Sequence, residues 1–285
     1  MLLGYNTNGL AHHDPLDALD LLAELGYGSV ALTLDHGRLD PFAPDLTARL
    51  AVVGERLQRL GLRNVIETGA RFLLDPRVKH EPTLVSPDPE RRSRRIDFLH
   101  RAIDIAALLG SDCVSLWSGV LRWMERGGAA FDRLVTGCAR AGPRAARGIV
   151  LGFEPELGMF IDTQRRYDEL VERLGRPAEF RLTLDIGHLH CQGRDSIVRL
   201  HARRYASQLV NVHLEDIRAG VHEHLMFGEG EIDFPPVLAA LHAANYRGGI
   251  HVELSRHSHD GPAAARRACE FLTPLLAMAT GHPQG

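Results

Sequence analysis

The chain has 285 residues, is 45% hydrophobic and carries a formal net charge of −3 at pH 7. This length is enough for one large core, and the small net charge provides no basic footprint for nucleic acid. No apolar run reaches the roughly 18 residues of a membrane helix, and the first ten residues lack the basic start of a signal peptide.

Strand-like and helix-like segments alternate from the N-terminus onwards. A short apolar strand over residues 1–5 ends at Asn6, and Asp14 followed by Pro15 is typical of a helix start, because a proline at the first helical position loses no hydrogen bond. Up to residue 120 we expect further strands at 29–34, 64–67 and 113–117, and helices at 15–25, 45–60 and 91–109.

The alternation breaks at residues 71–90, which contain four prolines and little periodicity. A loop of this length inside a compact domain is usually functional or mobile. We therefore interpret residues 71–90 as a lid.

The second half of the chain resumes the alternation. Residues 121–147 read as mostly helical, with breaks expected at Gly127–Gly128 and Pro143. We expect strands at 149–154, 180–185, 209–213 and 249–253. Helices are expected at 162–174, at 235–245 and at 262–278, and one more follows a cap at Asp195 or Ser196. A kink of the last helix at Pro274 is left open. A second long loop, at 215–233, carries His222 and His224.

Eight strands that alternate with eight helices predict an α/β fold, a (β/α)8 TIM barrel with parallel strands. No linker or low-complexity stretch divides the sequence, so we expect residues 1–285 to form a single barrel domain.

Metal-ligating residue types stand at the ends of the last four predicted strands: Glu154, Asp185, His213 and Glu253. Active sites of such barrels lie at the C-terminal ends of the strands, and neighbouring strands are about 4.8 Å apart, so four consecutive ends can enclose one ion. Three carboxylates and one imidazole suit Mn²⁺, Mg²⁺, Co²⁺ or Zn²⁺. Each residue alone has a plain structural explanation as a cap, a surface charge or a core histidine, but the set of four favours a metal site.

Five stretches carry a resemblance to a known family: GFEPE at Glu154, LTLDIGHLH at Asp185, NVHLED at His213, FGEGEIDF at 227–234 and HVELSRHSHD at Glu253. With them the chain resembles the xylose isomerase-like TIM-barrel superfamily, and within it the sugar phosphate isomerase/epimerase family. The resemblance is most distinctive from residue 149 onwards. It implies that the four strand-end residues bind one divalent metal ion, with Mn²⁺ the first choice, and that His188 binds oxygens of the substrate.

The resemblance also implies a reaction. A sugar, or a sugar-like polyol or keto acid, is isomerised or epimerised through a metal-stabilised enediolate, and a carboxylate moves the proton next to the carbonyl. Glu154 and Glu253 are the candidate catalytic residues and serve as ligands too. Two bases on opposite faces of the substrate give epimerisation and one base gives isomerisation; the sequence leaves both open.

Five further residues are candidates for binding the substrate: His224, Arg256, Trp117, Asn6 and Glu67. His224 and Arg256 lie in loops after the last two strand ends, and solvated side chains are the alternative for both. Trp117 can line a sugar pocket or simply pack in the barrel. Asn6 and Glu67 end the first and third strands.

Other functions stay open on the same residues. A metal-dependent lyase or dehydratase of the inosose type shares the first proton transfer. An endonuclease IV-like zinc phosphodiesterase needs extra histidine ligands at the ends of the third and fourth strands, where this chain has Glu67–Thr68 and Trp117–Ser118. The near-neutral charge also provides little affinity for phosphates. A non-catalytic binding protein would have no use for four ligands.

The cysteine content indicates the cellular compartment of the protein. The four cysteines, Cys113, Cys138, Cys191 and Cys269, form no CxxC pair, so we expect reduced thiols and a cytoplasmic protein. The expected partner is a small carbohydrate-like substrate, with neither nucleic acid nor membrane, and assembly into a homo-oligomer is left open.

Overall fold

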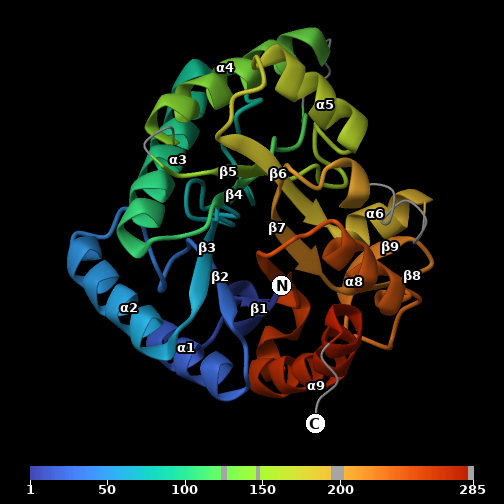
Figure 1. The fold of residues 1–285 in the computed structure, drawn as a ribbon. Helices are drawn as coiled ribbons and strands as arrows, with labels where there is room; N and C mark the ends of the chain where they lie inside the picture. The colour runs from blue at the N-terminus through green and yellow to red at the C-terminus, as the bar shows by residue number, and fades with distance from the viewer. Residues whose placement is uncertain (123–126, 146–147, 194–201, 282–285) are drawn as a thin grey trace. The chain divides into compact units, whose positions relative to one another are not determined.

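The computed structural model describes residues 1–122, 127–145, 148–193 and 202–281 of the chain. Strands and helices alternate along it (Figure 1). The strands are β1 (Leu2–Asn6), β2 (Ser29–Thr33), β3 (Arg63–Glu67), β4 (Val114–Leu116), β5 (Leu151–Phe153), β6 (Phe180–Asp185), β7 (Leu209–Leu214), β8 (Asp216–Arg218), β9 (Val221–Leu225) and β10 (Gly249–Val252). The helices are η1 (Thr7–Leu10), α1 (Pro15–Glu24), α2 (Leu46–Leu60), α3 (Pro89–Leu109), α4 (Gly127–Ala145), α5 (Gln164–Arg173), α6 (Ile186–Gly193), α8 (Phe234–Ala243), η2 (Ser255–Asp260) and α9 (Gly261–Thr280).

Within the described ranges, eight parallel strands close into a barrel in the order β1-β10-β7-β6-β5-β4-β3-β2. The predicted (β/α)8 barrel is therefore confirmed. Parallel strands of such folds are buried on both faces, which explains why all five residues of β2 are buried. In these same ranges every helix is too short or too polar to cross a bilayer.

By its internal contacts the chain divides into two compact units. The first unit comprises residues 1–32, 55–64 and 184–285, and the second comprises residues 33–54 and 65–183. Because the division falls inside strand β6, we retain one barrel domain over the whole chain as a proposal.

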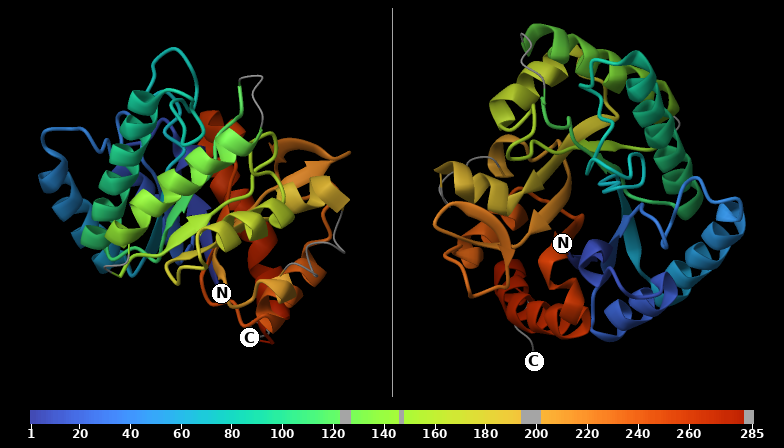
Figure 2. Two further views of the ribbon diagram at one scale, coloured as in Figure 1. Left: turned by 90° about the horizontal axis from the view of Figure 1, so that it is seen from above. Right: turned by 180° about the vertical axis from the view of Figure 1, so that it is seen from behind.

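In the first unit, β10 lies between β1 and β7. Leu3 pairs with Ile250, and His251 pairs with His213, so the register aligns the ends of these strands. Helix α9 (red) lies beside β1 and η1 (blue), so the last helix of the chain packs on its first residues (Figures 1 and 2).

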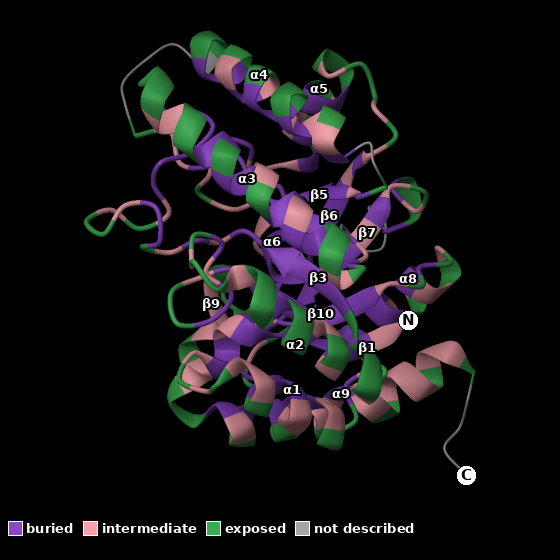
Figure 3. Ribbon diagram, turned by 90° about the vertical axis from the view of Figure 1, so that its left-hand side faces the viewer, coloured by how far each residue is buried: buried purple, intermediate pink, exposed green. Residues whose placement is uncertain are grey.

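In the second unit, β3, β4, β5 and β6 pair in sequence order, with Glu67 opposite Ser115 and Phe153 opposite Leu182. Helix α3 begins at Pro89, and the side chain of Asp88 caps it by accepting from the backbone N–H of Glu90. The inner face of α3 is buried and its outer face is exposed, as Figure 3 shows.

Helix boundaries agree with the sequence in most places and differ at Pro143, where a break was expected. Asp14 caps α1 through the N–H of Leu16, as expected. Pro143 lies inside α4 and does not break it, and Pro274 lies inside α9. The cap expected at Asp195 or Ser196 lies outside the described residues.

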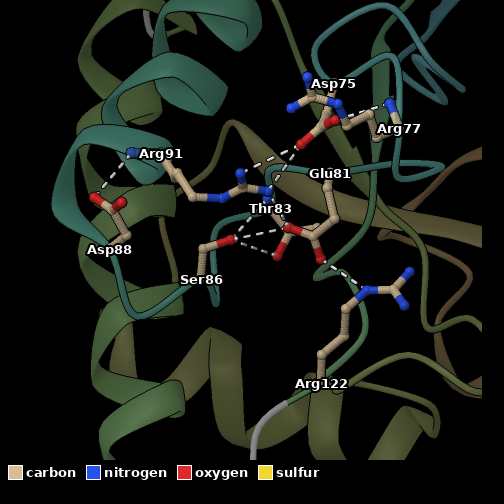
Figure 4. Close-up of polar contacts among 8 residues, drawn as sticks. All are labelled: Asp75, Arg77, Glu81, Thr83, Ser86, Asp88, Arg91 and Arg122. Carbon is tan, nitrogen blue, oxygen red and sulfur yellow. Dashed lines mark hydrogen bonds and ion pairs between the residues drawn. The ribbon is translucent and has the colours of Figure 1, made fainter.

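The segment interpreted as a lid is anchored around one carboxylate (Figure 4). Residues 81–86 are all buried. The Glu81 side chain accepts hydrogen bonds from Ser86 Oγ (3.2 Å), Arg91 (3.4 Å) and Arg122 (3.1 Å). Movement as a lid remains a prediction, and these contacts restrict it to the exposed residues around 76–79.

The second long loop contains an antiparallel hairpin that the sequence analysis did not predict. Strands β8 and β9 pair Asp216 with Leu225 and Arg218 with Val221, around a turn at Ala219 and Gly220 that both have positive φ. Two central residues with positive φ match the tight turns that suit the twist of hairpins.

Candidate functional site

Three of the predicted metal ligands lie in the first unit, each at the end of a different strand. Asp185 ends β6, His213 lies near the end of β7, and Glu253 follows β10. The Nδ1 atom of His213 lies 3.2 Å from Glu253 Oε2 and 3.9 Å from Asp185 Oδ2. The strands therefore bring the three side chains together.

Asp185 and His188 meet on the first turn of α6. The helix starts directly after β6, so Asp185 Oδ1 accepts the backbone N–H of His188 at 2.7 Å. The His188 Nδ1 atom lies 3.9 Å from the same oxygen. Both residues are buried, and the three-residue spacing explains why the imidazole lies beside the carboxylate.

Glu253 is held from the start of the chain. Asn8, in η1, donates its side-chain N–H to Glu253 Oε1 at 2.8 Å. Asn6 caps the same short helix by accepting from the backbone N–H of Asn8 at 3.1 Å. Asn6 therefore lies at the end of β1 as expected, but its side chain supports the turn that carries Asn8.

A line of buried polar groups continues from His213 into the barrel. The Asn211 side-chain nitrogen lies 3.0 Å from His213 Nε2, and its oxygen lies 2.8 Å from His251 Nδ1. The other nitrogen of His251 lies 2.9 Å from Ser29 Oγ. Gly4 leaves room for this ring, because a Cβ at that position would lie 2.4 Å from it.

The β8–β9 hairpin adds further side chains beside α6. The ring of His222 lies 4.4 Å from that of His188 and 4.2 Å from that of His224 between centroids. Glu215, which joins β7 to the hairpin, is fully buried, and its Oε1 lies 3.5 Å from His222 Nε2.

Burial and neighbouring charges shift the pKa values of these groups in opposite directions. Burial alone would raise the pKa of Asp185, but His188, His222 and His213 around it lower that pKa below its ordinary value. Burial, with negative Asp185 and Glu253 close by, raises the pKa of Glu215 well above its ordinary value. Burial also lowers the pKa of His188 to about 4.

The donor set fits a divalent cation. Asp185 Oδ2 is buried and accepts no hydrogen bond from any described residue. Within the described part of the chain, the ion-pair partners of Asp185, Glu215 and Glu253 are histidines, with no lysine or arginine among them. Buried carboxylates without a cationic partner are costly, and neutral imidazoles with carboxylates are ligands that Mn²⁺ and Zn²⁺ accept.

Three further predicted residues, Glu154, Glu67 and Trp117, lie in the second unit. Glu154 directly follows β5, and its backbone N–H donates to the carbonyl of Leu116 at 2.8 Å. Glu67 ends β3. The Trp117 ring packs between His80, at 5.3 Å, and the guanidinium of Arg95, at 4.5 Å. Glu154, Glu67 and Trp117 are all buried.

Arg256 lies in η2 and its side chain is 59% exposed. Its guanidinium donates to the backbone carbonyl of Glu223 at 3.2 Å and lies 3.6 Å from the Glu223 carboxylate. The structure thus pairs Arg256 with the outer side of β9, and a role in substrate binding stays a prediction.

Sequence reasoning missed Glu215 and Asn8. Glu215 had a usable signal, because it stands two residues after His213 and side chains two apart share a face of a strand. Asn8 had none, since its contact with Glu253 spans 245 residues. Asn211 stands two residues before His213, and His251 stands two residues before Glu253, so the same spacing was present there.

Comparison with known proteins places this geometry in a family. The description that matches residues 19–275 is the xylose isomerase-like TIM barrel. The L-ribulose-5-phosphate 3-epimerase UlaE of Shigella flexneri is 26% identical over 273 residues, which cover 93% of this chain and 90% of that protein.

Solved structures support the same fold. An L-ribulose 3-epimerase aligns with a TM-score of 0.76 at 21% identity, over 98% of this chain and 95% of the other. The IOLI protein with a bound zinc atom aligns with a TM-score of 0.75 at 16% identity, over 98% and 99% of the two chains. With a match over most of its length, the chain belongs to the xylose isomerase-like TIM-barrel family.

Proposed function

We propose that the chain is a divalent-metal-dependent sugar epimerase that inverts a carbon next to the carbonyl of a ketose or ketose phosphate. The observation that carries this proposal is the convergence of Asp185, His213 and Glu253 around a buried carboxylate oxygen that accepts no hydrogen bond. The enzyme class, sugar isomerase or epimerase, is supported by a relative over nine-tenths of the chain that is named a sugar 3-epimerase.

Four residues would hold the metal ion: Asp185, His213, Glu253 and Glu154. Glu154 is supported by the register of its strand, because Phe153 pairs with Leu182 and Glu154 therefore follows at the level of Thr183. When bound, the cation polarises a carbonyl and stabilises the negative charge that develops on its oxygen. Mn²⁺ is our first choice, and Mg²⁺, Co²⁺ and Zn²⁺ suit the same ligands.

The proton transfers fall to the two glutamates. Glu253 is fixed at both oxygens, by Asn8 and by His213, so its orientation is set before a substrate arrives. Glu154 is the second carboxylate. Bases on opposite faces of the substrate carbon would remove the proton from one side and return it on the other, which is epimerisation.

His188 and His224 would bind the hydroxyl oxygens of the sugar. Burial keeps the pKa of His188 at about 4, so its ring is neutral near pH 7 and can both donate and accept. Trp117, Asn6, Glu67 and Arg256 remain proposed substrate contacts, and cytoplasmic localisation remains a prediction from the free thiols.

A zinc phosphodiesterase of the endonuclease IV type is the second candidate, and one observation favours it. His188, His222 and His224 gather beside Asp185, which is a richer set of imidazoles than a single metal ion needs. The low net charge disfavours it. Cleavage of DNA at abasic sites distinguishes the two candidates.

The proposal is tested by proton exchange. The protein, stripped with a chelator and reloaded with Mn²⁺, is incubated in D2O with L-ribulose 5-phosphate or D-allulose and followed by NMR. We expect deuterium at carbon 3 together with the 3-epimer, and loss of both, with loss of metal, in Asp185→Asn. The control Glu223→Gln, on the β8–β9 hairpin and outside the site, keeps both. Exchange with an aldose as product would make it an isomerase, and no exchange with any ketose would refute the reaction class.

A further inference from the structure

Asn8, beside Glu253, uses only one end of its side-chain amide within the protein. The amide nitrogen donates to Glu253 Oε1 at 2.8 Å. The amide oxygen, Oδ1, is buried and accepts no hydrogen bond from any described residue. Turning the amide over would set two acceptor oxygens against each other, because an ionised carboxylate can only accept. The acceptor end of Asn8 is therefore fixed, and as a buried polar atom it needs a donor.

The pairing of β1 with β10 brings Asn8 and Glu253 together from opposite ends of the chain. Tyr5 pairs with Val252, so the residues that follow them, Asn6 and Glu253, leave the barrel at the same level. Asn8 lies in η1, the short helix that begins directly after Asn6. Its amide thus lies at the C-terminal edge of the strands, where barrels of this kind bind their substrates.

The short helix that carries Asn8 is held on two sides. Thr7 Oγ1 donates to the backbone carbonyl of Ala31, on β2, at 3.1 Å. The start of α9 packs closely on η1, because a Cβ at Gly261 would lie 2.9 Å from the carbonyl oxygen of Gly9. Asn8 cannot move far to find a donor, so the donor has to come to the position that the fold sets.

The side of the site next to Asn8 is the side that a ligand can reach. The Glu253 side chain is 18% exposed, whereas those of His213 and Asp185 are 2% and 1% exposed. Asn8 itself is half-buried. A substrate that approaches Glu253 therefore comes within reach of the Asn8 amide as well.

A ketose offers a donor at this place. The argument rests on the proposed function, in which Glu253 acts on the proton of carbon 3. Carbons 2 and 3 carry the oxygens that a bound cation would polarise. The nearest remaining hydroxyl to the base is then the one on carbon 4, because the hydroxyl on carbon 1 lies one carbon further away.

We propose that Asn8 determines substrate specificity by accepting a hydrogen bond from the hydroxyl on carbon 4 of the ketose. Its Oδ1 takes this hydroxyl while its N–H holds Glu253, so one amide links recognition of the substrate to the position of the base. A ketose without the hydroxyl leaves a buried acceptor unpaired, and a site built in this way rejects such an analogue.

Kinetics with deoxy substrates test the contact. The Mn²⁺-loaded wild type and Asn8→Ala are compared on D-allulose or L-ribulose 5-phosphate, whichever epimerises faster, and on its 4-deoxy and 1-deoxy analogues. We expect wild-type kcat/KM to fall about 10-fold or more for the 4-deoxy analogue. Asn8→Ala should lose most of this preference, although it is slower on all three substrates because Glu253 has lost its partner. The preference over the 1-deoxy analogue should be the same in both proteins.

Two more variants separate the two ends of the amide. Asn8→Asp retains an acceptor oxygen but loses the donor to Glu253, so we expect a lower kcat with the 4-deoxy preference kept. His12→Gln, at an exposed position of the same segment, should match the wild type.

An unchanged 4-deoxy preference in Asn8→Ala, or its loss in Asn8→Asp, would overturn the contact and leave the epimerase proposal intact. A wild type that epimerises no ketose would refute the proposed function and this inference with it.

Discussion

Asn211 lies beside His213 and influences which of its ring nitrogens carries the proton. Nδ1 of His213 faces Glu253 and Asp185, so a cation held there takes the lone pair of Nδ1 and requires the proton on Nε2. In the structure the Asn211 amide nitrogen faces His213 Nε2 and its oxygen faces His251 Nδ1. Turned by 180°, the amide would accept the His213 proton through its oxygen and donate its N–H to His251, whose other nitrogen would then donate to Ser29 Oγ. In that turned orientation the hydrogen-bond line would favour the tautomer that binds metal, with the proton on Nε2.

Replacing Asn211 by leucine should weaken metal binding without removing a ligand. Loss of such a supporting hydrogen bond typically costs about 10- to 100-fold in affinity, and Mn²⁺ titration by equilibrium dialysis measures it. Ser29→Ala, at the far end of the line, should have a clearly smaller effect. Equal affinity in Asn211→Leu and wild type would show that His213 needs no such selection.

The residues of the site could be predicted only where they end a recognisable strand. Asp185, His213 and Glu253 end apolar runs, so their position at one edge of a parallel barrel follows from the sequence. Their mutual distances did not follow, and the contact of Asn8 with Glu253 joins opposite ends of the chain. Such a contact is produced by closure of the strands and has no local signature.

At the scale of elements, the sequence pattern did not predict the structure of two segments, the loop 71–90 and the β8–β9 hairpin. The hairpin was missed because VHEHL lacks apolar alternation and its Ala219–Gly220 turn lacks the usual Asn–Gly or Asp–Gly signal. The prolines in 71–90 identified a loop, but nothing in its composition indicated that residues 81–86 are buried.

Removing the charge of Glu81 should loosen the loop 71–90. Glu81→Gln replaces the carboxylate that binds Arg91, Arg122 and Ser86, and hydrogen bonds to a charged group are worth roughly 1.5–3 kcal/mol each at most. We expect faster tryptic cleavage at the exposed Lys79 with little change in helix content. Asp75→Asn, which removes the charge of the other carboxylate beside Arg91, should change the cleavage rate less. An unchanged rate in Glu81→Gln would mean that packing alone holds the loop.

At the scale of the whole molecule, the alternation of strands and helices was sufficient to predict the barrel, because only a few topologies accommodate eight βα units. The molecule also contains buried histidines in both compact units. Burial lowers the pKa of His80 to about 4 and that of His251 to about 3. An unfolded histidine has a pKa of about 6.5.

These two pKa values predict loss of stability in mild acid. Below about pH 6.5 the unfolded chain binds protons on both histidines, whereas the folded chain does not until the pH approaches 4 or 3. The free energy of unfolding should therefore fall as the pH drops from about 6.5 to 4, by about 1.4 kcal/mol for each tenfold difference in proton affinity. Urea unfolding at a series of pH values measures this dependence.

A pair of variants assigns the acid effect. His80→Gln should show a shallower pH dependence, since it lacks one of the titrating groups. His12→Gln, at an exposed position, should follow the wild type. Parallel curves for wild type and His80→Gln would locate the acid sensitivity elsewhere.

The anchoring of the β8–β9 hairpin by Asp216 also constrains how this part of the sequence can vary in length. Residues added at the tip, beside Ala219 and Gly220, lengthen only the turn, because Asp216 holds both ends. Insertions and deletions among natural variants of this chain should therefore collect at the tip.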